Sequence, residues 1–284
     1  MGSRTARVRC VAAAPCWVSL MARDLDAAQA FYGELLGWEF ESAPDRFGPY
    51  LHAVVGGEAV AGLGVGGGDW AMPVAWTNYF GTESADTAAD AVRERGGTLA
   101  VGPLSIDAGR VAFAADPAGA VFGIWEGEPG PPGPTPTPTP TLPGFPVWTE
   151  LRTPDPFAAA MFYGEVFRWD DRDPAHFEVS WEHERVVLLV EGRSVAALRA
   201  EKALGPAGTP PHWEVSFSVP DTDTAAGRAE RLGGSVIGPV FDTPYGRVAR
   251  LRDPEGGRFS VISPPELQEP RESREPQGSR APRA

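Results

Sequence analysis

The stretch CWVSLMARDLDAAQAFYGELLGW, residues 16–38, decides the fold because the chain contains it twice. It aligns without gaps on VWTELRTPDPFAAAMFYGEVFRW, residues 147–169. Downstream, WTNYFGTESADTAADAVRERGG (76–97) matches WEVSFSVPDTDTAAGRAERLGG (213–234), and DPAGAVFGIW (116–125) matches DPEGGRFSVI (253–262). Repetition on this scale indicates a tandem duplication, with one domain over residues 14–127 and a second over residues 145–265.

The segments outside the two copies have a different composition. Residues 128–144 alternate threonine with proline, which removes backbone donors and favours an extended, semi-rigid linker. The tail over residues 266–284 has almost no apolar residues, and we expect it to be disordered. We expect the same of the N-terminal residues 1–13.

Each copy begins with a strand pattern followed by a helix pattern. The pattern of CWVSLMA predicts a strand. Asp24 and Asp155 stand where a helix N-cap is needed, and Gly37 follows the first helical stretch as a stop. Strands are predicted near 38–42, 50–55, 59–65, 76–81, 98–101, 110–115 and 120–125, with a helix over 84–95. The order βαβββ is thus expected twice in each copy.

Composition limits the classes of function. The formal net charge of −13 argues against nucleic acid or an anionic membrane as a partner. No apolar run reaches the roughly 18 residues of a membrane span. Cys10 and Cys16 support neither a disulfide framework nor a thiolate zinc site. We therefore expect a cytoplasmic protein, monomeric or homodimeric, with a small-molecule ligand as its partner.

Four βαβββ modules, with DL..A..FYG..LGW after the first strand and DP.G before the last, resemble the vicinal oxygen chelate superfamily. This superfamily contains glyoxalase I, extradiol dioxygenases and bleomycin-resistance proteins, and the chain is similar to its two-domain actinobacterial glyoxalase-like "hydroxylase" type. The resemblance implies an α+β fold: a tandem duplication of a glyoxalase-like domain, with four βαβββ modules in two cup-shaped sheets. In such a fold each cup holds the ligand.

The resemblance also implies where catalytic members hold a divalent metal. These positions are Trp17, Trp76 and Gly123 in the first copy and Trp148, Trp213 and Ser260 in the second. Indole and glycine cannot ligate a metal, and serine is a poor ligand. We therefore expect no cofactor and no metal at these positions. The alternative left open is a displaced divalent-metal site in the second copy, built from Glu150, His176, His183, His212 and Glu214.

Aromatic residues are the first candidates for ligand binding. Trp17, Trp76, Trp148 and Trp213 are expected to line the cups as a platform for a flat or apolar ligand. The other interpretation is that they fill the core, where large aromatics dominate buried sheet faces. Tyr245, in a turn near the cup mouth, is a further candidate for ligand contact.

Polar candidates follow from strand alternation. Glu150 lies two residues after Trp148 and should share its face, as should Arg152, which could pair with it. Ser19 is the counterpart of Glu150 in the first copy. Asn78 should share a face with Trp76 and orient a ligand, whereas Glu214 is expected to point away from the cup.

We therefore expect a small-molecule-binding protein that sequesters an aromatic or polyketide-like metabolite, as resistance proteins do. The alternative is a metal-independent or displaced-metal enzyme of secondary metabolism, of isomerase, lyase or hydroxylase type. In that case Glu150 is the general base, because a carboxylate in an apolar cup has a raised pKa. A role in assembly ranks last, since no large exposed apolar stripe argues for it.

Overall fold

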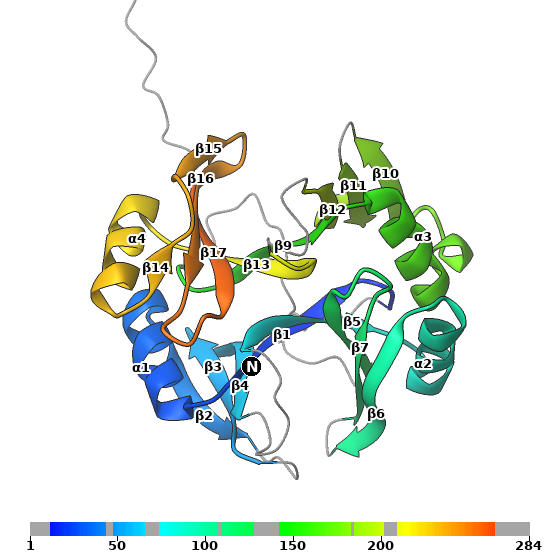
Figure 1. Ribbon diagram of the computed structural model, residues 1–284, viewed down its shortest axis with the longest axis horizontal. Coiled ribbons are helices and arrows are strands. Elements are labelled where there is room, and N and C mark those ends of the chain that lie inside the picture. The colour runs from blue at the N-terminus through cyan, green and yellow to red at the C-terminus, as the bar shows by residue number, and fades with distance from the viewer. Residues whose placement is uncertain are drawn as a thin grey trace, which may run out of the picture.

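The computed structural model describes residues 12–43, 48–65, 74–106, 109–127, 142–182, 185–201 and 209–264, and contains two mixed β-sheets (Figure 1). Sheet A contains β1 (Pro15–Ala22), β2 (Glu39–Ala43), β3 (Tyr50–Val55), β4 (Glu58–Val65), β5 (Ala75–Gly81), β6 (Thr98–Ile106), β7 (Gly109–Ala115) and β8 (Val121–Gly127). Sheet B contains β9 (Pro146–Thr153), β10 (Phe177–Glu182), β11 (Arg185–Val190), β12 (Arg193–Ala200), β13 (His212–Ser218), β14 (Ser235–Val236), β15 (Phe241–Thr243), β16 (Gly246–Arg252) and β17 (Arg258–Ser263).

The two sheets repeat one topology. Sheet A has the order β2-β3-β4-β1-β5-β8-β7-β6, and sheet B has β10-β11-β12-β9-β13-β17-β16-β14 with β15 paired to β16. In each sheet the opening strands of two modules, β1 with β5 and β9 with β13, pair antiparallel at the centre. The predicted fold class, four βαβββ modules in two sheets, is confirmed. In the fourth module two short strands, β14 and β15, pair with β16 in place of a single edge strand.

Helices α1 (Leu25–Leu36), α2 (Ala85–Glu94), α3 (Pro156–Phe167) and α4 (Thr222–Arg231) begin at side-chain caps, and a short 3-10 helix, η1 (Trp169–Asp171), follows α3. Asp24 accepts from the N–H of Ala27, and Asp155 caps α3 in the same way. Gly37 ends α1 with φ of 72°. Its counterpart Arg168 also has positive φ, 56°, a conformation that glycine adopts with less strain.

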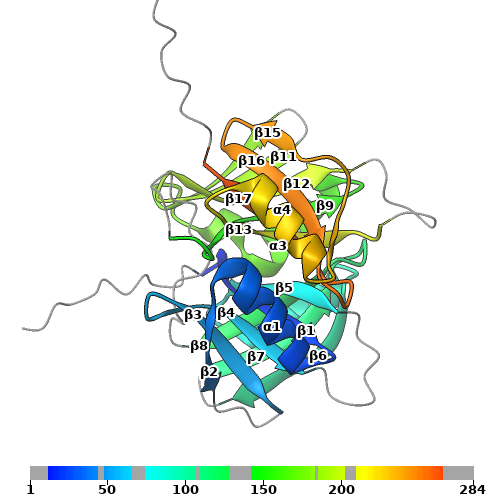
Figure 2. The same cartoon turned by 90° about the vertical axis from the view of Figure 1, so that its left-hand side faces the viewer.

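The two sheets pack against each other through one face each, which we call the core face; the opposite face is the outer face. Figure 1 shows the sheets curving away from each other about the central strands. Helices α1 and α4 lie side by side at one flank (Figure 2), and α2 and α3 at the other. Both hydrophobic core clusters contain residues of the two copies, so neither copy buries its core alone.

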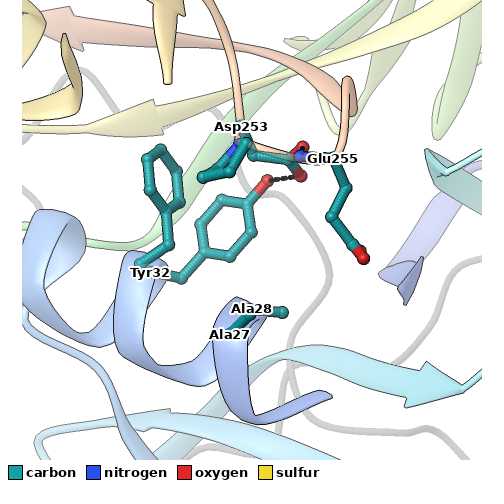
Figure 3. Close-up of a pocket in the computed structure, with 7 residues that line it drawn as sticks. Ala27, Ala28, Tyr32, Asp253 and Glu255 are labelled. Carbon is teal, nitrogen blue, oxygen red and sulfur yellow. Dashed lines mark hydrogen bonds between the residues drawn. The ribbon is translucent and has the colours of Figure 1, made fainter. Parts of the chain in front are cut away.

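A hydrogen-bonded pair from the repeated signatures joins the copies. The hydroxyl of Tyr32 on α1 donates to Oδ2 of Asp253 at 2.8 Å (Figure 3). The same hydroxyl accepts from Nε1 of Trp76 at 3.0 Å. The counterpart hydroxyl of Tyr163 donates to Oδ2 of Asp116 at 3.2 Å. It accepts from Nε1 of Trp213 at 2.9 Å. The tyrosine of FYG in each copy therefore binds the aspartate of DP.G in the other.

Burial fixes the direction of these bonds. Both tyrosines are fully buried, and burial raises the pKa of Tyr32 and of Tyr163 well above its ordinary value. The hydroxyls therefore stay protonated and donate to the carboxylates. The crevice beside Tyr32, between α1 and the β16–β17 turn, measures only about 10 Å³, room for about one water. It is a packing joint between the copies and is too small for a ligand.

Each folded copy begins at an earlier residue than the sequence predicts. Ala13, expected to be disordered, is buried; its N–H donates to the Gly81 carbonyl at 2.8 Å, and its carbonyl accepts from Nε1 of Trp169 at 3.2 Å. Gly144, expected in the linker, has a carbonyl that accepts from Nε1 of Trp38 at 2.8 Å. Residues 1–11, 128–141 and 265–284, which hold the rest of these predicted segments, lie outside the described residues. In the described part of the chain, no helix is long and apolar enough to cross a membrane.

Asn78 is an anomaly at the centre of the core. It is 2% exposed, and neither its amide N nor its amide O has a hydrogen-bond partner among the described residues. Trp76 contacts Phe217 across the two sheets, and Phe80 contacts Trp213. On β5 Asn78 lies midway between Trp76 and Phe80, and on β13 Val215 lies midway between Trp213 and Phe217. The amide therefore faces an apolar valine at the point where the copies cross.

We expect Tyr32→Phe to lower the free energy of unfolding by about 1–3 kcal/mol, because Asp253 and the Trp76 N–H each lose a buried partner. Urea unfolding measures this. Tyr163→Phe should cost a similar amount, because it breaks the counterpart pair. The exposed Tyr245→Phe is the control and should change stability by less than about 0.5 kcal/mol. A Tyr32→Phe cost as small as that of the control would contradict a joint at this position.

We expect Asn78→Val to raise the free energy of unfolding by about 1–3 kcal/mol, because it removes an unsatisfied buried amide and copies the residue of the second repeat. Thermal and urea unfolding provide the measurement. Val215→Asn is the matched reverse change and should lower stability. A destabilising effect of Asn78→Val would show that the amide has a favourable hydrogen-bond partner in the folded protein.

Candidate functional site

Two carboxylates and a guanidinium meet on the outer face of sheet B. Glu150 on β9 and Glu214 on β13 lie directly opposite each other across the strand pair. Nη2 of Arg152 lies 2.7 Å from Oε2 of Glu150 and 3.6 Å from Oε1 of Glu214. Ser260 on β17 donates from Oγ to Oε1 of Glu214 at 2.6 Å. We call Glu150, Arg152, Glu214 and Ser260 the charged cluster; all four are buried.

Further basic groups surround the charged cluster. Nε of Arg250 lies 3.8 Å from Oε1 of Glu214, and Nη1 of Arg199 lies 3.9 Å from Oε1 of Glu150. Nε2 of His212 lies 3.7 Å from Oε2 of Glu214. Each carboxylate thus faces more than one basic group.

The two carboxylates have opposite pKa shifts. Burial raises the pKa of Glu150, against the opposing charges of Arg152 and Arg199. Burial also acts to raise the pKa of Glu214, but His212, Arg152, Ser260 and Arg250 outweigh it and lower that pKa to about 2. Glu214 is therefore a fixed anion. Glu150 is the carboxylate that takes up a proton more readily than usual, which is the property of a general base.

The rim of this face carries an arginine and a tyrosine from different modules. Arg185 on β11 pairs with Glu182 on β10, with Nε at 2.8 Å from Oε2. The hydroxyl of Tyr245, in the turn before β16, lies 3.4 Å from Nη2 of Arg185, whose guanidinium carbon lies 6.0 Å from the ring centroid. Tyr245 is 67% exposed. The structure thus brings this predicted ligand contact to the rim above the charged cluster.

The outer face of sheet A is different in chemistry. Ser19, the counterpart of Glu150, bonds its Oγ to the hydroxyl of Tyr79 at 2.8 Å, and both are buried. The ring of Tyr79 lies where a Cβ on Gly123 would stand, 2.2 Å from that point. Tyr50 lies over Gly62 in the same way, and its hydroxyl accepts from Nε1 of Trp17 at 3.0 Å. Aromatic side chains here cover the glycines of the strands.

Three predicted ligand contacts lie on the core faces, which corrects the prediction. Trp76 and Trp213 are 4% exposed and donate to the buried tyrosines of the two joints. Asn78 follows Trp76 on the same face. Trp76 and Trp213 therefore fill the core, which was the other interpretation of these tryptophans. Trp17 and Trp148 are half-buried and share the outer faces with Ser19 and Glu150, respectively.

The expected orientation of Glu214 was wrong, because Trp213 points into the core and strand alternation then turns Glu214 outward. The strand HWEVSFS held the signal: His212, Glu214 and Ser216 alternate with Trp213, Val215 and Phe217. The predicted pair of Glu150 with Arg152 is present. Spacing along β9 or β13 could not indicate Arg199 or Arg250, because these residues reach the charged cluster from β12 and β16.

The residues present do not fit the divalent metal that the fold implies. The guanidinium of Arg152 lies between the carboxylates and already supplies the positive charge that a metal would. His176, from the proposed displaced set, bonds Glu191 in an exposed pair, and His183 lies outside the described residues. Over the described ranges, no three His, Cys, Asp or Glu side chains are grouped to hold a metal ion.

The fold and site define a tandem glyoxalase-like protein, and comparisons place it in a family. Residues 148–262 match the family model of a glyoxalase-like domain, and residues 16–48 match that of a bleomycin resistance protein-like N-terminal region. "Putative glyoxylase CFP32" of Mycobacterium bovis is 34% identical, with 89% of this chain and 96% of the relative aligned. The chain belongs to the glyoxalase-like family of the vicinal oxygen chelate superfamily, as the resemblance predicted.

Two further matches bear on the chain. "Anthracycline biosynthesis protein DauV" of Streptomyces sp. (strain C5) is 35% identical, with 90% of this chain and 94% of the relative aligned. Among solved structures, the Mn(II)-bound glyoxalase from Novosphingobium aromaticivorans superposes with a TM-score of 0.55 at 18% identity, over 89% of this chain and 82% of that one. The structural likeness shows the shared fold.

Proposed function

We propose that this chain is a small-molecule-binding protein of secondary metabolism that takes an aromatic, polyketide-like metabolite on the outer face of sheet B. The observation that carries the proposal is the charged cluster beside a half-buried indole. Trp148 precedes Glu150 by two residues on β9, so the two side chains share a face. An aromatic surface beside fixed polar groups is the arrangement that orients a planar ligand.

Sheet B is favoured over sheet A because its polar groups are more numerous and are charged. On sheet A the hydroxyls of Ser19 and Tyr79 bond each other, and the aromatic rings cover Gly62 and Gly123. On sheet B, arginines and glutamates present donors and acceptors for the oxygens of a hydroxylated ligand. Relatives named for anthracycline biosynthesis support a ligand of this class.

The proposed mode of binding uses neither a metal nor a cofactor. At the inherited positions Trp148 and Ser260 are poor donors, and Trp213 faces the core. Arg152 neutralises the two carboxylates that lie nearby. The protein's contribution is then affinity and orientation from an indole, two arginines and a rim tyrosine.

We expect a hydroxylated anthraquinone aglycone to bind with a Tm rise that grows with ligand concentration. Trp148→Leu should weaken binding at least about tenfold, through lost stacking and buried aromatic area. Calorimetry on the same compound measures this. Trp17→Leu changes the equivalent residue of sheet A and should leave affinity unchanged. If Trp17→Leu weakens binding and Trp148→Leu does not, the binding site lies on sheet A. Failure of a broad panel of polyketide aromatics to bind at all would remove the proposal.

A second candidate function is an enzyme that abstracts a proton next to a ligand carbonyl. The observation in its favour is the raised pKa of Glu150 beside the lowered pKa of Glu214, because such opposed environments divide acid–base roles. Glu150 would take the proton as general base. Arg152 would stabilise the oxyanion that forms.

For this candidate we expect Glu150→Gln to reduce turnover of a bound ligand by about 10²–10⁴-fold while binding persists, because an amide cannot accept the proton. Mass spectrometry of reaction mixtures measures turnover, and calorimetry measures binding. Glu178→Gln, at an exposed position of β10, is the control. Unchanged turnover in Glu150→Gln would exclude Glu150 as the base.

A further inference from the structure

Basic residues lie in register across the central strands of sheet B. Arg185 on β11 is paired with Arg199 on β12, and Arg199 is paired with Arg152 on β9. Arg152 is in turn paired with His212 on β13. Residues directly opposite on neighbouring strands present their side chains to the same face. The pairing therefore places three arginines and a histidine side by side on the outer face.

Two further arginines lie on the other arm of the sheet, two residues out of register with this row, because Ser216 pairs with Ser260 and Arg258 is therefore level with Glu214. Arg258 on β17 is paired with Arg252 on β16. Their neighbours Phe259 and Leu251 are buried in the core, so strand alternation turns both arginines to the outer face. The basic row is the set of residues Arg185, Arg199, Arg152, His212, Arg258 and Arg252.

Such a row is unfavourable in the ligand-free protein. Like charges directly opposite on paired strands repel each other, and partial burial weakens the screening by water. Carboxylates offset part of this charge. Glu182 pairs with Arg185, and Glu150 pairs with Arg152 and Arg199. Glu214 lies near Arg152 and His212, and Glu201 lies near Arg152. The chain as a whole has a net charge of −13, so this concentration of positive charge runs against its composition.

On β16, Arg247 and Arg250 pair with carboxylates, whereas Arg252 and its partner Arg258 have less compensation. In the part of the chain that the structure describes, no ion pair joins Arg252 or Arg258 to a carboxylate. Burial and the neighbouring Arg252 lower the pKa of Arg258 from its ordinary value, against the opposing charges of Glu214 and Glu201. Nε of Arg252 and Nε of the buried Arg152 have no hydrogen-bond partner among the described residues. A bound anion would relieve the repulsion between Arg252 and Arg258 and would supply an acceptor for the unpaired Nε of Arg252.

We propose that the basic row binds the acidic group of the ligand, so that the ligand is an aromatic acid with an ionised carboxylate next to its ring. The proposal rests on the proposed function, whose site it extends from Trp148 and the charged cluster to Arg252 and Arg258. Guanidinium groups bind a carboxylate through paired N–H donors. In this arrangement the indole of Trp148 contacts the aromatic ring of the ligand, and the basic row binds its carboxylate.

The test is calorimetry with 1-hydroxy-2-naphthoate and with its methyl ester, which keeps the rings and loses the carboxylate charge. We expect wild-type protein to bind the acid at least about tenfold more tightly than the ester. Arg252→Gln and Arg258→Gln should each reduce affinity for the acid and leave affinity for the ester unchanged. Arg193→Gln, at the exposed start of β12, makes the same charge change outside the row and should bind the acid as wild type does.

The melting temperature of the ligand-free variants separates binding from folding. Arg258→Gln should melt at or above the wild-type temperature, because it removes a repulsive neighbour of Arg252. A lower melting temperature with equal loss of acid and ester binding would mean a structural role and overturn the proposal. Equal wild-type affinity for acid and ester would also overturn it and leave the proposed function standing. If neither compound binds and the aromatic panel also fails, the proposed function fails too.

Discussion

The buried hydrogen bond between a tyrosine of one copy and an aspartate of the other is the constraint on which the architecture depends. Tyr32 and Asp253 lie 221 residues apart in the chain, and their bond fixes α1 against the turn between β16 and β17. Tyr163 and Asp116 do the same for α3 and the turn before β8. Because each tyrosine also accepts from a core tryptophan, the joint connects helix, turn and central strand of both sheets.

This joint uses the core faces, and the outer faces have diverged around it. The same backbone positions carry Ser19 and Gly123 in one sheet and Glu150 and Ser260 in the other. Small residues in sheet A make room for the rings of Tyr50 and Tyr79. Charged residues in sheet B surround Arg152 instead. One fold thus presents an aromatic surface on one side and an ionic surface on the other, and the second is the better candidate for function.

Local patterns in the sequence predicted much of the fold. The repeat predicted four modules, Asp24 and Asp155 predicted the helix starts, and a spacing of two predicted that Glu150 and Arg152 share a face. The faces of β5 and β13 were misjudged because Trp76 and Trp213 were assigned from a family position instead of from alternation. The strand AWTNYFG has aromatic and polar residues on both faces, so alternation alone does not resolve it. The basic row and the tyrosine–aspartate joints depend on pairing between distant strands, which no local spacing encodes.

The position of Asn78 opposite Val215 has a consequence for the history of the chain. The two strands cross at the axis that relates the copies, so in an assembly of two identical copies the residue at this point would meet itself. Joining the copies in one polypeptide removes that identity, and each side of the axis is then free to change alone. An amide opposite a valine, and a glutamate in one sheet where the other has a serine, are arrangements that a symmetric pair of identical chains cannot hold.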